Sequence, residues 1–298
     1  MSTSEKIRNG HTDAPKRKKH RKHRGSTVLF ILGIVFLTAF CYSTFKLGEY
    51  LVQSQREKSA FDTLSGIVEK DAASTEVTRS PDLSDRSQSG NLPDQSEAAA
   101  PQETPKVPLA KYETIYEMNH DFFGWLSIEG TSVDYPVVYT PDRPEYYLDR
   151  GFDGTFTGSG VPFIDERCPE EGDFYLIYGH HMQNKTMFGP LPYYAERNYY
   201  EVHPFIRFDT RFEEREYQVA AAFYSRVYEE DEVGVFRYYE YFDLTEQSVF
   251  DEYVSQVKAA AIYDTGVEMQ YGDELLALST CNYHTADGRF VVVAKRVS

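Results

Sequence analysis

The chain has 298 residues, a formal net charge of −16 and three cysteines. Its length allows one large domain or two ordinary ones. The cysteines and histidines lack zinc-ligand spacing and no glycine-rich phosphate loop is present, which excludes a zinc-ribbon protein and a P-loop nucleotide-binding enzyme. The charge is unevenly spread: residues 1–25 hold nine Lys and Arg against two acids, a net of +7, so the remainder carries −23.

An uncharged run follows this basic tail, from Gly25 to Phe45. As a helix, its 21 residues span about 31 Å, enough to cross the hydrocarbon core of a membrane. The run lacks a small-residue cleavage site, so we predict an uncleaved transmembrane anchor over 26–46 rather than a signal peptide. The basic cluster places residues 1–25 in the cytoplasm and everything after Lys46 outside the cell. Nucleic-acid binding by the tail is the less favoured alternative, because a membrane span follows it directly.

Two segments connect the anchor to the rest of the chain. A juxtamembrane helix is predicted over 47–70, where Phe61, Leu64 and Ile67 fall on one helical stripe. Residues 71–108 contain no aromatic residue and five prolines, so they cannot bury enough apolar surface to fold. As a flexible chain, these 38 residues hold their ends roughly 35 Å apart. We therefore predict a disordered tether that holds a folded domain off the membrane.

Residues 109–298 are dense in Tyr and Phe and form one predicted domain, whose roughly 190 residues are ample for a single core. Short apolar runs alternate with Gly, Pro and Asp turns, a pattern that predicts eight strands and a closed β-barrel. The predicted strands are Gly124–Ile128, Val133–Val138, Val161–Ile164, Phe174–Tyr178, Phe205–Phe208, Tyr217–Tyr228, Leu275–Ser279 and Phe290–Arg296.

Two helices accompany the predicted strands. A short one is expected at the domain's start, with Tyr112 and Ile115 on its apolar face. A longer one over 245–261 has Tyr253 and Val257 on one face, and Thr245 with Ser248 offers N-cap chemistry.

The last predicted strand pair carries a candidate reactive thiol. Cys281 lies where the run Leu275–Leu278 ends, and Arg289 lies where the run Phe290–Ala294 begins. If these strands pair, both side chains lie at the same end of the sheet, and the guanidinium favours the thiolate. The alternative is a buried cysteine beside a surface arginine.

The word LSTC, followed by Arg eight residues after its cysteine, resembles the signature of sortases, the membrane-anchored cysteine transpeptidases of Gram-positive bacteria. Three further segments resemble class B sortases in particular: EMNHDFFGWLSIEGTSVDYPVVYTPDRPEYYL, GVPFIDERC and IYGHHMQNKTMFGPL. The resemblance covers about Tyr112 to Val297. It implies a mainly β fold, an eight-stranded sortase β-barrel with an N-terminal helix and an extra helix, here 245–261, before the cysteine strand.

The resemblance also implies roles for three residues. Cys281 is the nucleophile, and the site must stabilise its thiolate form. His180, the first His of Tyr-Gly-His, is the general acid and base. Arg289 stabilises the negative charge that builds on the carbonyl oxygen, or binds the substrate backbone. A strand-end salt bridge from Arg289 to Asp287 is the open alternative.

Two other histidines are rivals for the role of base. His181 is adjacent to His180, so on a strand it points to the other face. His284 is three residues past Cys281 and could reach the thiol from a loop, although a solvated loop histidine is the favoured interpretation.

Substrate contacts follow from the same resemblance. Leu148 matches the family's apolar contact for a substrate proline, and Ser279 and Thr280, beside the nucleophile, could hydrogen-bond substrate. Pro144 departs from the class B pattern, in which a polar Asn is common, and this leaves the specificity for the first substrate residue open. Cys168 is expected to be an unpaired thiol, because pairing with Cys281 would abolish the nucleophile. No metal and no cofactor are expected.

The implied function is cleavage of a C-terminal sorting signal of the Asn-Pro-x-Thr type after Thr, followed by transfer of a surface protein from a Cys281 thioester to an amine. The amine would come from a peptidoglycan cross-bridge or a pilin lysine. A pilin-polymerising sortase and a non-catalytic, sortase-like binding domain are the alternatives. An L,D-transpeptidase is disfavoured because its Ser-His-Gly-Cys-like word is absent. The expected location is the cell membrane, with the catalytic domain outside and no nucleic-acid partner.

Overall fold

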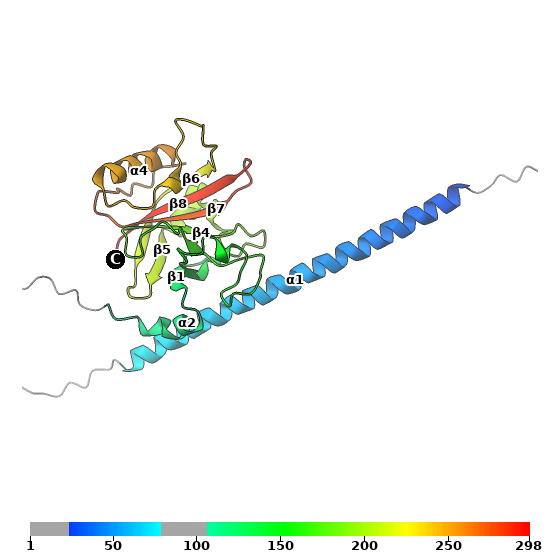
Figure 1. The fold of residues 1–298 in the computed structure, drawn as a ribbon, viewed down its shortest axis with the longest axis horizontal. Helices are drawn as coiled ribbons and strands as arrows, with labels where there is room; N and C mark the ends of the chain where they lie inside the picture. Colours follow the sequence, from blue (N-terminus) through cyan, green and yellow to red (C-terminus); the bar gives the residue numbers. More distant parts are fainter. Residues whose placement is uncertain (1–23, 79–105) are drawn as a thin grey trace, which may run out of the picture. The chain divides into compact units, whose positions relative to one another are not determined.

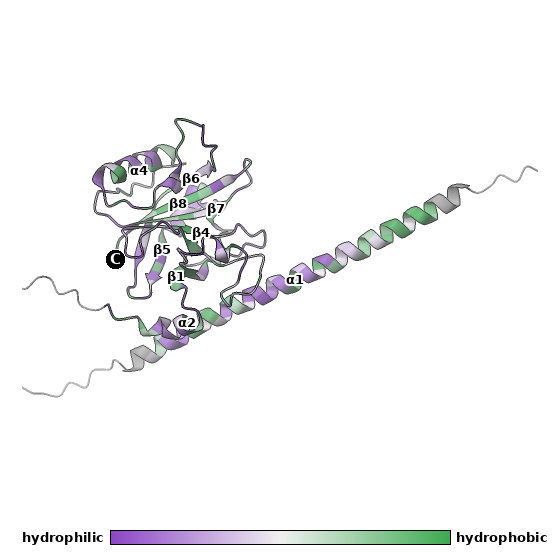
Figure 2. Ribbon diagram, viewed as in Figure 1, coloured by the Kyte–Doolittle hydropathy of each residue, from purple (hydrophilic) through white to green (hydrophobic). Residues whose placement is uncertain are grey.

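The structure, a computed structural model, describes residues 24–78 and 106–298 (Figure 1). Its contacts divide the chain into two compact units, with the boundary along the chain between Val52 and Gln53. Helix α1 (Arg24–Thr78) contains a stretch long and apolar enough to cross a membrane. Figure 2 shows hydrophobic residues along the first part of this helix and hydrophilic residues further along it. The predicted basic tail lies outside the described residues, apart from its last two positions.

Eight strands form a closed barrel in the order β1-β2-β3-β4-β7-β8-β6-β5, so the predicted eight-stranded barrel is confirmed. Each strand overlaps one of the eight predicted runs. Their bounds are β1 (Phe122–Ser127), β2 (Asp134–Val138), β3 (Phe163–Ile164), β4 (Phe174–Tyr178), β5 (Phe205–Thr210), β6 (Glu216–Arg226), β7 (Leu275–Cys281) and β8 (Gly288–Arg296).

Strands β4, β7 and β8 are apolar on both faces because protein covers both faces. All residues of β7 from Leu275 to Thr280 are buried. Helix α4 (Gln247–Ala260) packs onto the barrel, and the ring of its Tyr253 meets Phe174 of β4 edge-on with centroids 5.3 Å apart. Strands buried on two sides are continuous apolar runs rather than alternating ones, which is why these runs stand out in the sequence.

The start of α4 differs from the prediction. Its N-cap is Glu246, which makes no side-chain cap bond. The Thr245 hydroxyl donates instead to Asp243 at 2.7 Å, and the Ser248 hydroxyl donates to Glu246 at 2.5 Å. The expected cap from Thr245 and Ser248 is therefore wrong, because a neighbouring carboxylate takes each hydroxyl in a local turn.

Shorter helices join the strands. They are η1 (Ala110–Tyr112), α2 (Glu113–Met118), η2 (Tyr146–Leu148), η3 (Leu191–Ala195), α3 (Arg197–Val202) and η4 (Tyr238–Glu240). The expected N-terminal helix is thus present as η1 and α2, with Tyr112 and Ile115 buried.

Helix α1 continues past the predicted juxtamembrane helix into the first eight residues of the expected tether, 71–78. A tertiary contact supports this extension, since the Thr114 hydroxyl of α2 donates to the Asp71 carboxylate at 2.7 Å. The rest of the expected tether, apart from residues 106–108, lies outside the described residues.

Candidate active site

The C-terminal ends of β4 and β7 bring the candidate histidine beside the candidate nucleophile. These strands are parallel, and Tyr178 is in register with Ser279. The ladder continues beyond the strand, because the Gly179 amide donates to the Ser279 carbonyl at 3.1 Å. His180 and Cys281 each lie two residues past this registered pair, so their backbones are neighbours at one end of the barrel.

Strand β8 brings the candidate arginine to the other side of the cysteine. Cys281 is directly in register with Arg289 in the antiparallel β7–β8 pair, as predicted from the two apolar runs. Gly288 permits this close return of the chain, since a Cβ at this position would lie 2.1 Å from the Asn282 carbonyl oxygen. Cys281 thus lies on the middle of three adjacent strands, and all three candidate catalytic side chains are half-buried.

The His180 ring is held by a backbone carbonyl. Its Nε2 lies 2.7 Å from the carbonyl oxygen of Leu148. A carbonyl only accepts hydrogen bonds, so Nε2 carries a proton and Nδ1 is the nitrogen that can gain or lose one. This contact fixes the tautomer that an acid–base group needs.

The two rival histidines occupy other positions. His181 binds the backbone of the cysteine strand: its Nδ1 lies 2.9 Å from the carbonyl oxygen of Cys281, and its ring packs on Tyr283. His284 is bound through Nδ1 to the Asn282 side chain at 3.0 Å. Sequence reasoning missed the contact of His181, which ties the end of β7 to the segment after β4.

The Arg289 guanidinium binds backbone rather than a carboxylate. Its Nη1 donates to the carbonyl oxygens of Asp287, at 3.3 Å, and Gly288, at 3.1 Å. Among residues 24–78 and 106–298 it forms no ion pair, so the alternative salt bridge to the Asp287 side chain is wrong. A guanidinium has five N–H donors, and those of the other two nitrogens can meet a developing oxyanion.

Ser279 and Thr280 have internal partners. The Ser279 hydroxyl lies 2.7 Å from the Tyr238 hydroxyl of η4, and the Thr280 hydroxyl donates to the Gly179 carbonyl at 2.7 Å. Both residues are at most 2% exposed. Burial raises the pKa of Tyr238 above its ordinary value, so it remains a neutral phenol. These hydroxyls fasten β7 to its neighbours and do not face an open surface, whereas Leu148 is 40% exposed.

An ion pair between a buried carboxylate and an exposed guanidinium supports the end of β4. Arg167 binds the Asp165 carboxylate through Nε at 2.9 Å and Nη2 at 2.7 Å, and the Tyr178 hydroxyl donates to the same carboxylate at 3.0 Å. Burial alone would raise the pKa of Asp165, but the hydrogen bonds and charge of Arg167 outweigh it and hold the pKa below its ordinary value. Arg167 also donates to the Tyr239 carbonyl, which links β4 to the segment before α4. The Asp-x-Arg spacing was the only signal for this cluster in the sequence.

The surroundings of the second barrel cysteine, Cys168, make its thiol unreactive. Cys168 is unpaired, as expected, and 1% exposed. Burial raises its pKa to about 12, and its sulfur accepts the Leu176 amide at 3.5 Å. Within the described barrel, Cys281 is the cysteine with access to solvent.

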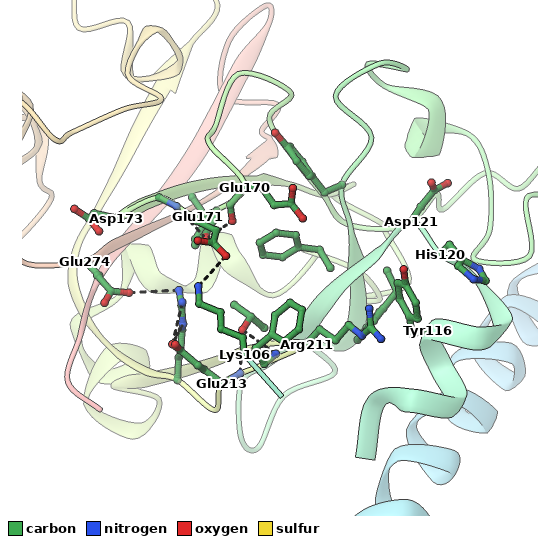
Figure 3. Close-up of a pocket in the computed structure, with 18 residues that line it drawn as sticks. Lys106, Tyr116, His120, Asp121, Glu170, Glu171, Asp173, Arg211, Glu213 and Glu274 are labelled. Atoms are coloured by element: carbon green, nitrogen blue, oxygen red, sulfur yellow. Dashed lines mark hydrogen bonds and ion pairs between the residues drawn. The ribbon is translucent and has the colours of Figure 1, made fainter. Parts of the chain in front are cut away.

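The pocket in Figure 3 lies at the opposite end of the barrel. It is lined by Asp173 and Glu274, the residues immediately before β4 and β7, whereas His180 and Cys281 follow those strands' C-terminal ends. Several of its charges are paired with one another, for example Lys106 with Glu171 at 2.9 Å. In the described ranges no group of three or more His, Cys, Asp or Glu side chains could hold a metal ion.

The candidate thiol, histidine and arginine thus come from neighbouring segments at one end of a closed barrel, and comparisons with known proteins identify the family. The Sortase domain profile matches residues 126–297, more than half of the chain. The chain belongs to the sortase family of transpeptidases.

Its relatives are class B sortases, which confirms the resemblance drawn from the sequence motifs. The chain is 26% identical to Sortase B of Listeria monocytogenes over 271 residues, covering 90% of this chain and 96% of the relative. It is 28% identical to Sortase B of Staphylococcus aureus over 189 residues, covering 62% of this chain and 74% of the relative.

Solved structures agree on the fold. The crystal structure of Staphylococcus aureus sortase B matches with a TM-score of 0.56 at 27% identity, over 63% of this chain and 87% of that one. The Staphylococcus aureus sortase B–substrate complex matches with a TM-score of 0.65 at 22% identity, over 83% of this chain and 99% of that one.

Proposed function

We propose that this protein is a membrane-anchored cysteine transpeptidase that cuts a C-terminal sorting signal of the Asn-Pro-x-Thr type after Thr and joins the surface protein to a cell-wall amine. The observation that carries the proposal is the position of Cys281, which is in register with Arg289 of β8 and follows the Tyr178–Ser279 pair by two residues, as His180 does after β4.

In the first step, the Cys281 thiolate attacks the carbonyl carbon of the substrate Thr. A C–S bond forms, and the carbonyl electrons move to oxygen, where Arg289 donates N–H groups to the oxyanion. The C–N bond then breaks as His180, protonated on both nitrogens, gives its Nδ1 proton to the leaving amine. The Leu148 carbonyl retains the proton on Nε2, and a thioester is left on Cys281.

In the second step, an acceptor amine attacks the thioester. Neutral His180 takes a proton from this amine at Nδ1, the new amide bond forms, and Cys281 leaves as a thiolate. The acceptor is a peptidoglycan cross-bridge amine, because an enzyme tethered at the wall meets such amines at high local concentration. A pilin lysine would enter by the same chemistry.

Substrate recognition rests on Leu148 and Arg289. The half-exposed Leu148 suits the substrate proline, whose fixed φ lowers the cost of ordering the peptide. Arg289 suits the Thr carbonyl. Ser279 and Thr280 support the site through Tyr238 and Gly179, and we assign them no direct substrate contact.

The proposed topology follows the charge and hydropathy of the N-terminal residues. Residues 1–25 form a cytoplasmic tail, 26–46 the membrane anchor, and 47–70 a juxtamembrane helix, all ahead of a tether and the extracellular domain 109–298. The uncharged run from Gly25 to Phe45 supports the anchor. Protease added to intact protoplasts should cut the chain within the tether, and a tether that stays protected would contradict this orientation.

The proposed specificity is tested with a library of sorting peptides, read by mass spectrometry with and without an amine acceptor. We expect cleavage after Thr in Asn-Pro-x-Thr peptides and an amide product when the amine is present. A preference for Leu-Pro-x-Thr-Gly peptides would contradict the assigned specificity. Hydrolysis with every acceptor tried would contradict transpeptidation.

A further inference from the structure

The part of α1 that belongs to the barrel unit, residues 53–78, is here called the docking segment. Phe61 and Leu64 are its buried side chains, at 8% and 5% exposure. The Ser65 hydroxyl donates to Asp134 at 2.6 Å, and the same carboxylate accepts the Trp125 indole N–H at 2.7 Å. Two buried apolar side chains and a shared carboxylate show that the docking segment is a packed part of the domain.

The docking segment reaches the turn that follows the candidate base. This histidine turn, residues 181–188, folds back so that the Phe188 amide donates to the His180 carbonyl at 2.9 Å. His181 and Met187 pair across it as an isolated bridge. The position of the His180 backbone therefore depends on the closure of this turn.

Three residues connect the docking segment to the histidine turn. The Phe61 ring meets the Tyr135 ring edge-on, with centroids 5.1 Å apart. The Tyr135 hydroxyl in turn accepts the Met187 amide at 3.0 Å. A second link lies nearby, where the Asn184 side chain donates to the Ser54 hydroxyl at 2.7 Å.

The backbone of the turn needs such support. Lys185 and Met187 have positive φ angles, 67° and 53°, which residues with a side chain rarely adopt unless surrounding contacts hold them. Met187 is 1% exposed. A groove separates the docking segment from the turn elsewhere, lined among others by Ser54, Phe61 and Lys185, so few contacts carry the connection.

We propose that the docking segment positions His180 through Phe61, Tyr135 and the Met187 amide, so that the juxtamembrane helix is a working part of the catalytic domain. Phe61 and Tyr135 are positioning residues that do not touch substrate. The inference rests on the proposed role of His180 as acid and base. It predicts that loosening this connection slows the proton-transfer steps and leaves substrate binding intact.

The test uses the full chain in detergent and measures kcat and KM for a sorting peptide. Tyr135→Phe removes one hydroxyl and keeps the ring, and we expect kcat to fall about 3- to 10-fold, as for the loss of one hydrogen bond, with KM unchanged. Phe61→Ala should lower kcat in the same way, and Phe61→Leu should restore most of it. The alkylation rate of Cys281 should not change, because the thiol itself is untouched.

Thr114→Val is the matched control. It removes a hydrogen bond to Asp71 of the same docking segment, but Thr114 is bonded to a different part of that segment from the one that reaches the histidine turn. We expect it to keep the wild-type kcat. Wild-type kcat in Tyr135→Phe and Phe61→Ala, or an equal loss of kcat in Thr114→Val, would overturn the inference. Failure of the proposed function is distinguishable, since His180→Ala would then be as active as wild type.

Discussion

The two ends of the barrel differ in how their polar groups are used. At the start of β4 and β7, cations and carboxylates line a pocket and pair with one another, as Arg215 does with Glu213 at 3.0 Å and Glu274 at 3.4 Å. At the end of the same strands, Arg289 donates from one nitrogen to backbone only, and Cys281 is half-buried. The end that carries Cys281 therefore differs from the pocket end in its half-buried thiol and in a guanidinium that binds backbone rather than carboxylates.

The largest difference in reactivity is expected between the two thiols of the barrel, Cys281 and Cys168. Burial raises the pKa of Cys168 to about 12, so its thiol stays protonated, and its 1% exposure also shields it from reagents. We expect an alkylating reagent to label Cys281 in the folded Cys41→Ser protein and Cys168 only after unfolding. Peptide mapping by mass spectrometry measures both. Equal labelling of the two thiols in folded protein would contradict the predicted difference in their reactivity.

The next largest effect, a loss of peptide turnover, is expected when the candidate base His180 is removed. His180→Ala should lower turnover of a sorting peptide about 10²- to 10⁴-fold, the usual contribution of general acid–base catalysis. Circular dichroism should show a folded domain, because the ring is half-buried at the edge of the barrel. His284→Ala is the matched control and should keep wild-type turnover. The reverse pattern would reassign the base.

Arg289 tests the role given to a guanidinium that binds backbone rather than a carboxylate. Arg289→Ala should lower kcat about 10²- to 10³-fold, as the loss of an oxyanion donor does. Arg289→Lys keeps the charge but not the planar donor geometry, so it should recover only part of this loss. Steady-state kinetics with both variants decide the matter, and full activity in Arg289→Ala would assign the oxyanion contact elsewhere.

The smallest effect is expected at the opposite end. The Lys106–Glu171 pair is largely exposed, and pairs of this kind contribute about 0–1 kcal/mol. Glu171→Gln should therefore leave turnover unchanged and shift the free energy of unfolding by less than about 1 kcal/mol. Denaturant titration and peptide turnover measure the two quantities. A large loss of turnover would mean that the pocket of Figure 3 takes part in the reaction.

Much of the fold could be predicted because its strands are apolar runs bounded by turn residues. The β4 run was located to the residue, and α4 to within two. The cap of α4 could not be predicted, because the choice of Asp243 by the Thr245 hydroxyl is a local competition that the sequence leaves open. Strand β3 is shorter than its apolar run, since only Phe163 pairs with β2, opposite Val138.

The candidate site, too, could be predicted only in part from the sequence. The Cys281–Arg289 pair could be predicted from the residues, because two runs joined by a short loop pair as neighbours. His180 came from the motif resemblance alone, since the pairing of β4 with β7 joins segments about 100 residues apart. Other contacts between distant segments, such as that of Tyr238 with Ser279 or of Phe61 with Tyr135, depend on how the barrel closes and leave no local pattern.

In the proposed mechanism, Cys281 forms the acyl-enzyme, with His180 as the acid and base and Arg289 as the oxyanion donor. The most direct measurement is intact and peptide-mapped mass spectrometry of the protein after brief reaction with an Asn-Pro-x-Thr peptide, with Cys168→Ala as the matched control. We predict that wild type and Cys168→Ala gain the mass of the peptide up to Thr on Cys281, that an added amine removes it, and that Cys281→Ala gains none. An adduct on another residue, or one that no amine removes, would contradict this account.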